Sequence, residues 1–142
     1  MLRLQNLKHV NIFQTSVTNG GTATGTVDTL GFDEVLISVK VPTSDSTSNN
    51  PSVFKLEEGD TTSSFSSMSA VGDTDWTIPD ANTSNPQLFQ FHVTKTGARK
   101  RYLKLTISPT TTMVLSATAL LGRAAELPNS TTEQGTVYSL NL

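Results

Sequence analysis

Cysteine is absent from this chain of 142 residues, and histidine occurs only twice. Without thiols the protein has no disulfide framework, no thiolate zinc site and no cysteine nucleophile. Charge is also scarce, because charged residues make up 15% of the chain, against about 25% in ordinary soluble domains. The formal net charge of -2 gives no bulk attraction for nucleic acid or for an acidic membrane surface. We therefore expect neither as a partner.

Long hydrophobic runs are missing as well. No stretch approaches the roughly 18 consecutive apolar residues that a membrane-spanning helix requires. The basic start of the chain, Met1 to Val10, is not followed by the apolar segment of a signal peptide. The sequence therefore predicts a protein without membrane contact that is made and kept in the cytoplasm.

Serine and threonine take the place of the missing charges. Ordinary helical proteins carry Glu, Lys, Ala and Leu on their exposed faces. Threonine, valine, isoleucine and phenylalanine favour strands instead, while serine, asparagine, glycine and proline favour the turns between strands. The composition therefore favours β structure.

Alternation of apolar and polar residues predicts where the strands lie. The clearest case is the segment 35–41, in which Val35, Ile37 and Val39 share one face. Other segments of this kind are 9–15, 25–29, 53–57, 73–78, 87–94, 101–108 and 113–121. About eight short strands separated by turn signals are typical of sandwiches and barrels. We predict an all-β protein, an antiparallel β-sandwich of about eight strands, with no helix.

Glycine, proline and aspartate mark the turns between these strands. Gly20-Gly21 predicts a turn between the first two strands, and Glu58-Gly59-Asp60 predicts one after the fourth. The residues 96–99 have the composition of a hairpin turn, which would pair the strand 87–94 with the strand 101–108. Gly122 is expected to end the last strand of the sandwich.

The two ends of the chain depart from the strand pattern. We expect an N-terminal arm over residues 1–8, a sandwich over residues 9–122, and a C-terminal arm or tail strand over residues 123–142. The tail ends in a strand-like segment whose apolar and aromatic residues are candidate partner contacts: Val137, Tyr138, Leu140 and Leu142. Such a segment either adds to a sheet edge of another subunit or folds back as one more strand of its own sheet.

No catalytic apparatus is legible. There is no Gly-x-Ser-x-Gly nucleophile elbow, and His9 and His92 are expected on the surface. Glu57 and Glu58 are neighbours in a strand and point to opposite faces, so they do not converge on one ligand. Aspartates beside glycine and proline mostly cap turns rather than bind calcium. We expect no enzyme activity, no metal and no cofactor.

One basic concentration stands out, formed by Arg99, Lys100 and Arg101. These side chains could contact phosphates or an acidic protein surface, or they could keep a sheet edge from pairing promiscuously. Because the chain is acidic overall, a protein is a better candidate partner for these residues than nucleic acid is. The three residues are therefore candidate partner contacts, together with the tail.

The order of landmarks along the chain resembles that of a known group of proteins. The landmarks are Leu30-Gly31-Phe32-Asp33, the strand from Phe54 to Asp60, the segment Asp75 to Pro79, the strand from Arg99 to Leu105, and Leu121-Gly122-Arg123. This order is similar to that of the small virion proteins found near the capsid genes of tailed bacteriophages, which are capsid decoration (cement) or related head proteins. Glu57 and Gly59 stand where those proteins more often have glutamine and serine.

The resemblance implies a jelly-roll-like sandwich that sits as a homo-oligomer on the major capsid protein. A trimer is favoured, and a dimer is possible. It also implies a location on the capsid surface of the virion, after synthesis in the host cytoplasm, with no enzyme activity and no cofactor. Jelly rolls recur among capsid and lectin domains.

Two alternative functions remain open. A carbohydrate-binding module or a tail-associated adhesin would need exposed aromatic rings, for which Trp76, Tyr102 and Tyr138 are the candidates. A small hydrolase would need a concave site that joins His9 or His92 to a carboxylate.

Overall fold

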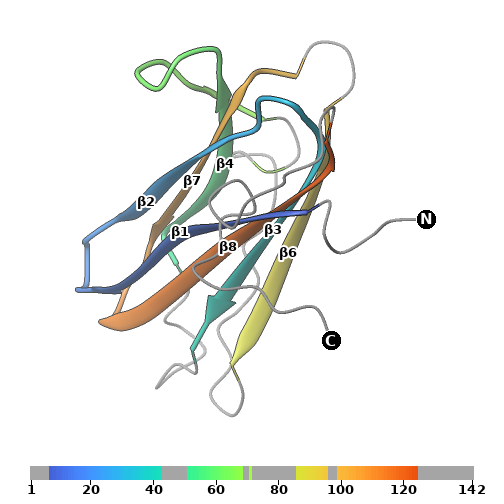
Figure 1. The fold of residues 1–142 in the computed structure, drawn as a ribbon. Helices are drawn as coiled ribbons and strands as arrows, with labels where there is room; N and C mark the ends of the chain where they lie inside the picture. Colours follow the sequence, from blue (N-terminus) through green and yellow to red (C-terminus); the bar gives the residue numbers. More distant parts are fainter. Residues whose placement is uncertain (1–6, 43–50, 69–70, 72–85, 96–98, 125–142) are drawn as a thin grey trace, which may run out of the picture.

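The computed structural model describes residues 7–42, 51–68, 71, 86–95 and 99–124 (Figure 1). These residues form strands and contain no helix, so none of their elements is a helix that could cross a membrane. The strands are β1 (Lys8–Val17), β2 (Ala23–Asp28), β3 (Phe32–Val41), β4 (Val53–Gly59), β5 (Ser66–Ser67), β6 (Gln87–Thr94), β7 (Tyr102–Ser108) and β8 (Met113–Ala124).

The eight strands form two antiparallel sheets of four strands each. The first sheet has the order β1-β8-β3-β6, and the second has the order β2-β7-β4-β5. Successive strands lie in alternate sheets, except β4 and β5, which are neighbours in the second sheet. Eight antiparallel strands divided in this way between two facing sheets form a jelly roll. The predicted all-β sandwich of about eight strands is confirmed.

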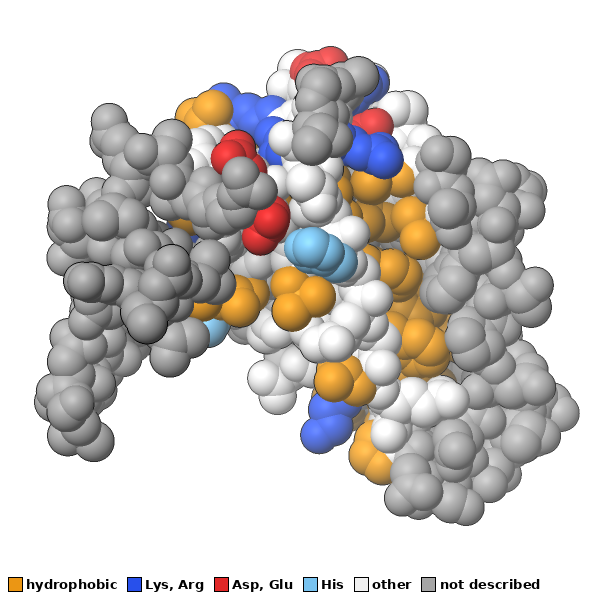
Figure 2. All heavy atoms as spheres, turned by 90° about the vertical axis from the view of Figure 1, so that its right-hand side faces the viewer, with side chains coloured by type: hydrophobic (Ala, Val, Ile, Leu, Met, Phe, Trp, Pro, Cys, Tyr) orange, Lys and Arg blue, Asp and Glu red, His pale blue; other side chains and the backbone are white. Residues whose placement is uncertain are grey.

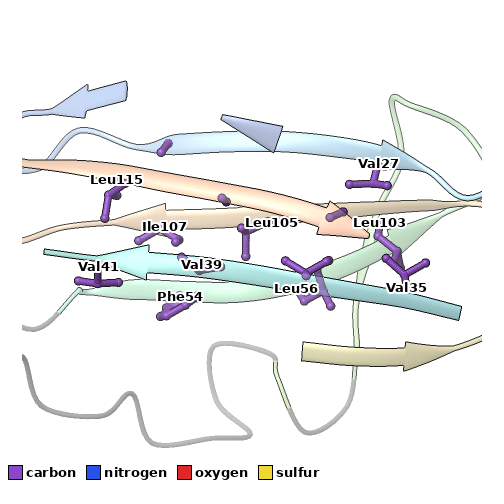
Figure 3. Close-up of a cluster of buried hydrophobic side chains, with 14 of the residues drawn as sticks. Val27, Val35, Val39, Val41, Phe54, Leu56, Leu103, Leu105, Ile107 and Leu115 are labelled. Atoms are coloured by element: carbon purple, nitrogen blue, oxygen red, sulfur yellow. The ribbon is translucent and has the colours of Figure 1, made fainter. Parts of the chain in front are cut away.

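The core lies between the two sheets. Alternation along β3 buries Val35, Ile37 and Val39 completely, and the same period buries apolar residues on β4, β7 and β8 (Figure 3). The ring of Phe54 meets the rings of Phe89 and Phe91 edge to face, with centroids 5.2 and 5.5 Å apart. Each fully buried large apolar side chain of the core contributes about 1.5–3 kcal/mol to folding. The core therefore stabilises the sandwich without a disulfide.

Two strands include a glycine that the sequence predicts to lie beyond the end of the strand. Gly59 is the last residue of β4 and pairs with Tyr102, so the predicted turn at residues 58–60 begins too early. A Cβ at Gly59 would collide with the backbone oxygen of Ser64, so glycine here permits the close approach of the following chain. Gly122 likewise lies inside β8 and pairs with Glu34, so the strand does not end there.

The predicted hairpin between β6 and β7 is wrong. β6 pairs with β3 in the first sheet, whereas β7 pairs with β2 and β4 in the second. The chain between them therefore crosses from one sheet to the other. Alternation and a turn signal are present in a hairpin and in a crossing connection alike, so the sequence could not separate the two. Residues 96–98 of this connection lie outside the described residues.

The two sheets approach each other closely on the side formed by β1 and β2. Where β1 and β2 face each other, a Cβ at Gly25 would lie 2.8 Å from the backbone oxygen of Ile12, so the sheets are in direct contact. The predicted turn between these strands is confirmed, with Gly20 at a φ of 75° and the N–H of Gly21 donating to the Thr18 oxygen at 2.9 Å. The opposite side is bounded by β6, at the right of Figure 1.

The sandwich runs from Lys8 to Ala124, one residue earlier and two residues later than the sequence predicts. The two predicted arms fall almost entirely on residues 1–6 and 125–142, which lie outside the described residues. The predicted strand 73–78, with Trp76, lies outside them as well.

Candidate docking surface

The outer face of the first sheet is broad and nearly uncharged. Its side chains come from the positions of β1, β8, β3 and β6 that alternate with the core positions, and none of them is buried. We call this surface the polar face. Its residues are His9, Asn11, Gln14, Ser16, Glu34, Leu36, Ser38, Lys40, Leu88, Gln90, His92, Thr94, Val114, Ser116, Thr118 and Leu120.

The strand register arranges the polar face in rows. The middle row consists of hydroxyl and amide side chains, in the order Asn11, Thr118, Ser38 and Gln90. Within it, the Gln90 Nε2 donates to the Ser38 Oγ at 3.4 Å. The adjacent row has a histidine at each edge and two leucines between them: His9, Leu120, Leu36 and His92. The face thus presents many short polar groups over a partly apolar surface.

Two large apolar side chains stand out from the polar face. Leu88 is 64% exposed on β6, and Val114 is 55% exposed on β8. Val114 also lines a shallow depression of about 410 Å³, together with Gln14, Lys40, Pro42, Pro86 and Ser116. Each of the two stands singly among the polar side chains of this face.

The outer face of the second sheet is organised by charge, and we call it the ionic face. It centres on Glu57, which is 8% exposed. The Lys104 Nζ lies 2.8 Å from the Glu57 Oε2, and the Lys55 Nζ lies 3.5 Å from the Oε1. Lysines from two strands therefore neutralise a single carboxylate that the sheet has largely removed from water.

Aromatic rings on the ionic face lie against cations. The Lys104 Nζ lies 4.5 Å from the ring centroid of Phe65, in the connection between β4 and β5. The guanidinium of Arg101 lies 4.8 Å from the ring centroid of Tyr102. Each cation–π contact of this kind contributes roughly 0.5–1 kcal/mol at an exposed site. Tyr102, a candidate sugar-stacking residue, thus carries an arginine over one side of its ring.

The predicted basic contacts, Arg99, Lys100 and Arg101, bind acidic and polar groups within the molecule. The Arg99 guanidinium lies 3.4 Å from the Glu58 Oε1. The backbone N–H of Lys100 donates to the Glu58 Oε2 at 3.2 Å, and its Nζ donates to the Ser66 Oγ at 3.3 Å. These contacts attach the start of β7 to β4 and β5.

Arg101 makes the shortest ion pair of this group. Its Nε and Nη2 donate to the two carboxylate oxygens of Asp28 at 2.8 and 2.6 Å, which is the two-point geometry that arginine favours. Hydrogen bonding by Arg101 is the main cause that lowers the pKa of Asp28 below its ordinary value, and burial opposes it. The pKa of Arg101 is raised by the same contact.

Arg99 and Arg101 also line a depression of about 320 Å³ at this end of the sandwich, with Lys95 and Asp33. Because Glu58 and Asp28 already pair with the two arginines, the depression has little excess positive charge. Arg99 and Arg101 therefore hold loops together. Because their charges are already paired, they are less suited to binding an acidic partner than their residue types alone predict.

The other candidate residues are not gathered into one site. His9 and His92 are exposed on opposite edge strands of the first sheet. Glu57 and Glu58 contact different lysine and arginine residues, as their opposite faces predict. No group of three or more potential metal ligands occurs within the described residues. The predicted contacts of the tail, Val137, Tyr138, Leu140 and Leu142, lie outside the described part of the chain.

No protein-family model matches this chain, and no curated protein matches it in sequence. Among solved structures, a 4-O-methyl-α-glucuronidase of family GH115, BtGH115A, with specificity for decorated arabinogalactans, is similar with a TM-score of 0.43 and 10% sequence identity. The similarity covers 80% of this chain and 17% of that enzyme.

Proposed function

We propose that this protein is a structural virion protein, a capsid decoration or cement protein that binds the assembled head of a tailed phage and stabilises it. The observation that carries the proposal is the polar face, an exposed sheet surface with two charged residues, Glu34 and Lys40, among hydroxyl, amide and apolar groups. The resemblance in the order of sequence landmarks supports the same conclusion.

The chemistry of the polar face suits docking on a regular protein lattice. Hydroxyl and amide groups form hydrogen bonds with a partner and cost less to remove from water than charged groups do. Leu88 and Val114, the exposed apolar residues of this face, are the expected anchors, since a few buried side chains carry most of the energy of an interface. Many copies on one lattice, or copies linked as an oligomer, gain further strength through effective concentration.

The proposed partner is the major capsid protein, and the proposed active form is a homo-oligomer, with a trimer favoured. In this proposal the protein resides on the capsid surface after synthesis in the host cytoplasm. It has no catalytic role and needs no cofactor. A jelly roll by itself does not determine function, so the proposal depends on the polar face and on the resemblance rather than on the fold.

A docking experiment with matched variants tests the proposal. Purified protein is mixed with undecorated phage heads, and binding is followed by co-sedimentation. We expect saturable binding at a fixed ratio to the capsid lattice. Thr118→Arg, in the centre of the polar face, should weaken binding at least about tenfold, because it buries an unpaired charge at the interface. Thr26→Arg, an exposed threonine on the ionic face, is the matched control and should bind normally.

Two results would contradict the proposal. The first is a pair of observations: the protein does not bind heads saturably, and it binds specific glycans in an array, with binding abolished by Tyr102→Ala. This result would favour the carbohydrate-binding alternative. The second is equal binding by both arginine variants, which would place the docking surface elsewhere. Measuring the native mass of each variant distinguishes lost docking from lost assembly.

A further inference from the structure

Within the described residues, β6 is an edge strand of the first sheet. β6 pairs with β3 along one side, and no other strand of the described residues pairs with the second side. The N–H of Lys95 donates to the Asp33 oxygen at 2.7 Å, so these two residues form a hydrogen-bonded pair. Hydrogen-bonded and non-hydrogen-bonded pairs alternate along an antiparallel ladder. The odd-numbered residues of β6 therefore bond to β3. The backbone groups that point away from β3 are those of Leu88, Gln90, His92 and Thr94.

Other sheet edges in the described residues carry features that prevent pairing with another strand. β1 has a register shift between Asn11 and Phe13 and lies directly against β2. The edge of β4 is covered by β5 and by hydrogen bonds of Leu56 with Val71 and Met68. β6 has neither feature, since its eight residues are in continuous register with β3 and include no Asp, Glu, Lys, Arg or Pro. Such an edge is a template for an additional strand.

An apolar groove runs beside this edge, between β6 and the segment that covers β4. Its volume is about 320 Å³. Its apolar lining residues are Leu56, Met68, Val71, Phe91 and Val93, and its polar lining includes His92 and Arg99. Figure 2 views the molecule from this side and shows hydrophobic side chains gathered there. A free backbone edge next to an apolar groove is the arrangement by which sheets accept extended peptides, because the backbone pairs and alternate side chains enter the groove.

The last described strand ends close to this edge. Ala124 of β8 pairs with Phe32 at the end of the sheet where Thr94 pairs with Glu34. β3 alone separates β8 from β6, so the two strand ends lie about 10 Å apart. Eleven residues, 125–135, precede Thr136, and eleven residues can extend at most about 36–40 Å. The chain is therefore long enough for the following segment to reach the β6 edge from the Thr94 end.

The segment 136–142 has the residue pattern that the groove requires. In an extended conformation Tyr138, Leu140 and Leu142 share one face, and Ser139 and Asn141 lie on the other. β6 has the same pattern, with apolar residues toward the core and mostly polar residues outward. The segment also has no charged residue and no proline, so it can pair along its whole length.

We infer that residues 136–142 add to the edge of β6 that faces away from β3 in the same molecule, as a further strand antiparallel to β6, with Tyr138, Leu140 and Leu142 in the groove. The tether of eleven residues gives the segment an effective concentration of roughly millimolar at its own edge, which favours its own subunit over a neighbour. This inference does not depend on docking to a capsid, and its test uses the isolated protein.

Hydrogen exchange of single amides in the full-length protein tests the inference. Strand addition predicts that the amides of Leu88, Gln90, His92 and Thr94 exchange slowly in the wild-type protein. Leu140→Asp places a charge in the groove and should raise their exchange rates about 100-fold, as expected when one buried leucine is lost. The amides of Phe91 and Val93, which bond to β3, should keep their protection. Asn141→Asp is the matched control and should leave the four edge amides protected.

Several outcomes would overturn the inference. Fast exchange of the four amides in the wild-type protein would mean that the edge is open. Protection that survives Leu140→Asp would mean that another segment, such as residues 72–85, or the β6 edge of a second copy covers it. Protection that disappears on dilution together with an oligomer would assign the added strand to a second subunit.

Discussion

The two outer faces of the sandwich have similar strand frameworks and opposite chemistry. The ionic face concentrates its charge on Glu57, which two lysines neutralise, and the connection after β4 folds back over it. The polar face has few charges, and its side-chain hydrogen bond between Gln90 and Ser38 is long, at 3.4 Å. The difference indicates that the ionic face contributes to the stability of the fold, whereas the polar face is the surface at which we propose docking.

The largest effect on stability is expected from reversing a charge on the ionic face. Lys104→Glu would place two carboxylates next to each other at a half-buried position and would also remove the cation over Phe65. Like charges at this separation and the lost cation–π contact should lower the free energy of unfolding by about 2 kcal/mol. Urea denaturation monitored by circular dichroism measures the change.

Thr118→Glu on the polar face is the matched control for this reversal. It adds a negative charge at an exposed position in the centre of a sheet, and it should change the free energy of unfolding by no more than about 0.5 kcal/mol. Equal losses in the two variants would remove the distinction between the faces.

An intermediate effect, dependent on pH, is expected at the Asp28–Arg101 pair. Because the pKa of Asp28 is lowered in the folded protein, the pair stabilises the fold fully above the ordinary value of 3.8, and this stabilisation is lost as the pH falls below it. Both side chains are about two-fifths exposed, so screening by solvent keeps the contribution small.

Asp28→Asn tests this pH dependence. The variant should be less stable than the wild-type protein at pH 7, and the difference should shrink as the pH falls below 3.8, where the wild-type carboxylate also becomes protonated. Free energies of unfolding from urea titrations at several pH values would show the convergence. A constant difference between pH 7 and pH 2 would contradict the assignment of the effect to this carboxylate.

Alternation in the sequence was sufficient to predict which side chains face the core, and insufficient to predict which strands pair. Ile37, Phe91 and Leu105 all lie on the inner faces that the period of two predicts. The same period is present whether two successive strands form a hairpin or lie in opposite sheets. The pairing of β6 with β3 instead of β7 therefore required the three-dimensional structure.

The candidate site was harder to predict, because it depends on register between distant strands. The middle row of the polar face joins Asn11 to Thr118 and Ser38 to Gln90, residues that no local pattern connects. The sequence drew attention to Arg99 and Arg101 instead, because basic residues are conspicuous in a chain with little charge. Their acidic partners, Glu58 and Asp28, lie far away in sequence and become evident only once β4, β2 and β7 are adjacent.

The smallest effect is expected within the polar face itself, and it provides the most direct test of its role. In a double-mutant cycle, Gln90→Ala and Ser38→Ala should each change the free energy of unfolding by no more than about 0.5 kcal/mol, with a coupling close to zero. Both residues lie on the outer face, and the hydrogen bond between them is long. A surface that serves a partner can have this property, because its hydroxyl and amide groups are not needed by the fold. A coupling above about 1 kcal/mol would instead mean that the Gln90–Ser38 hydrogen bond helps to hold β3 and β6 together. That result would contradict the proposal that the polar face is a docking surface.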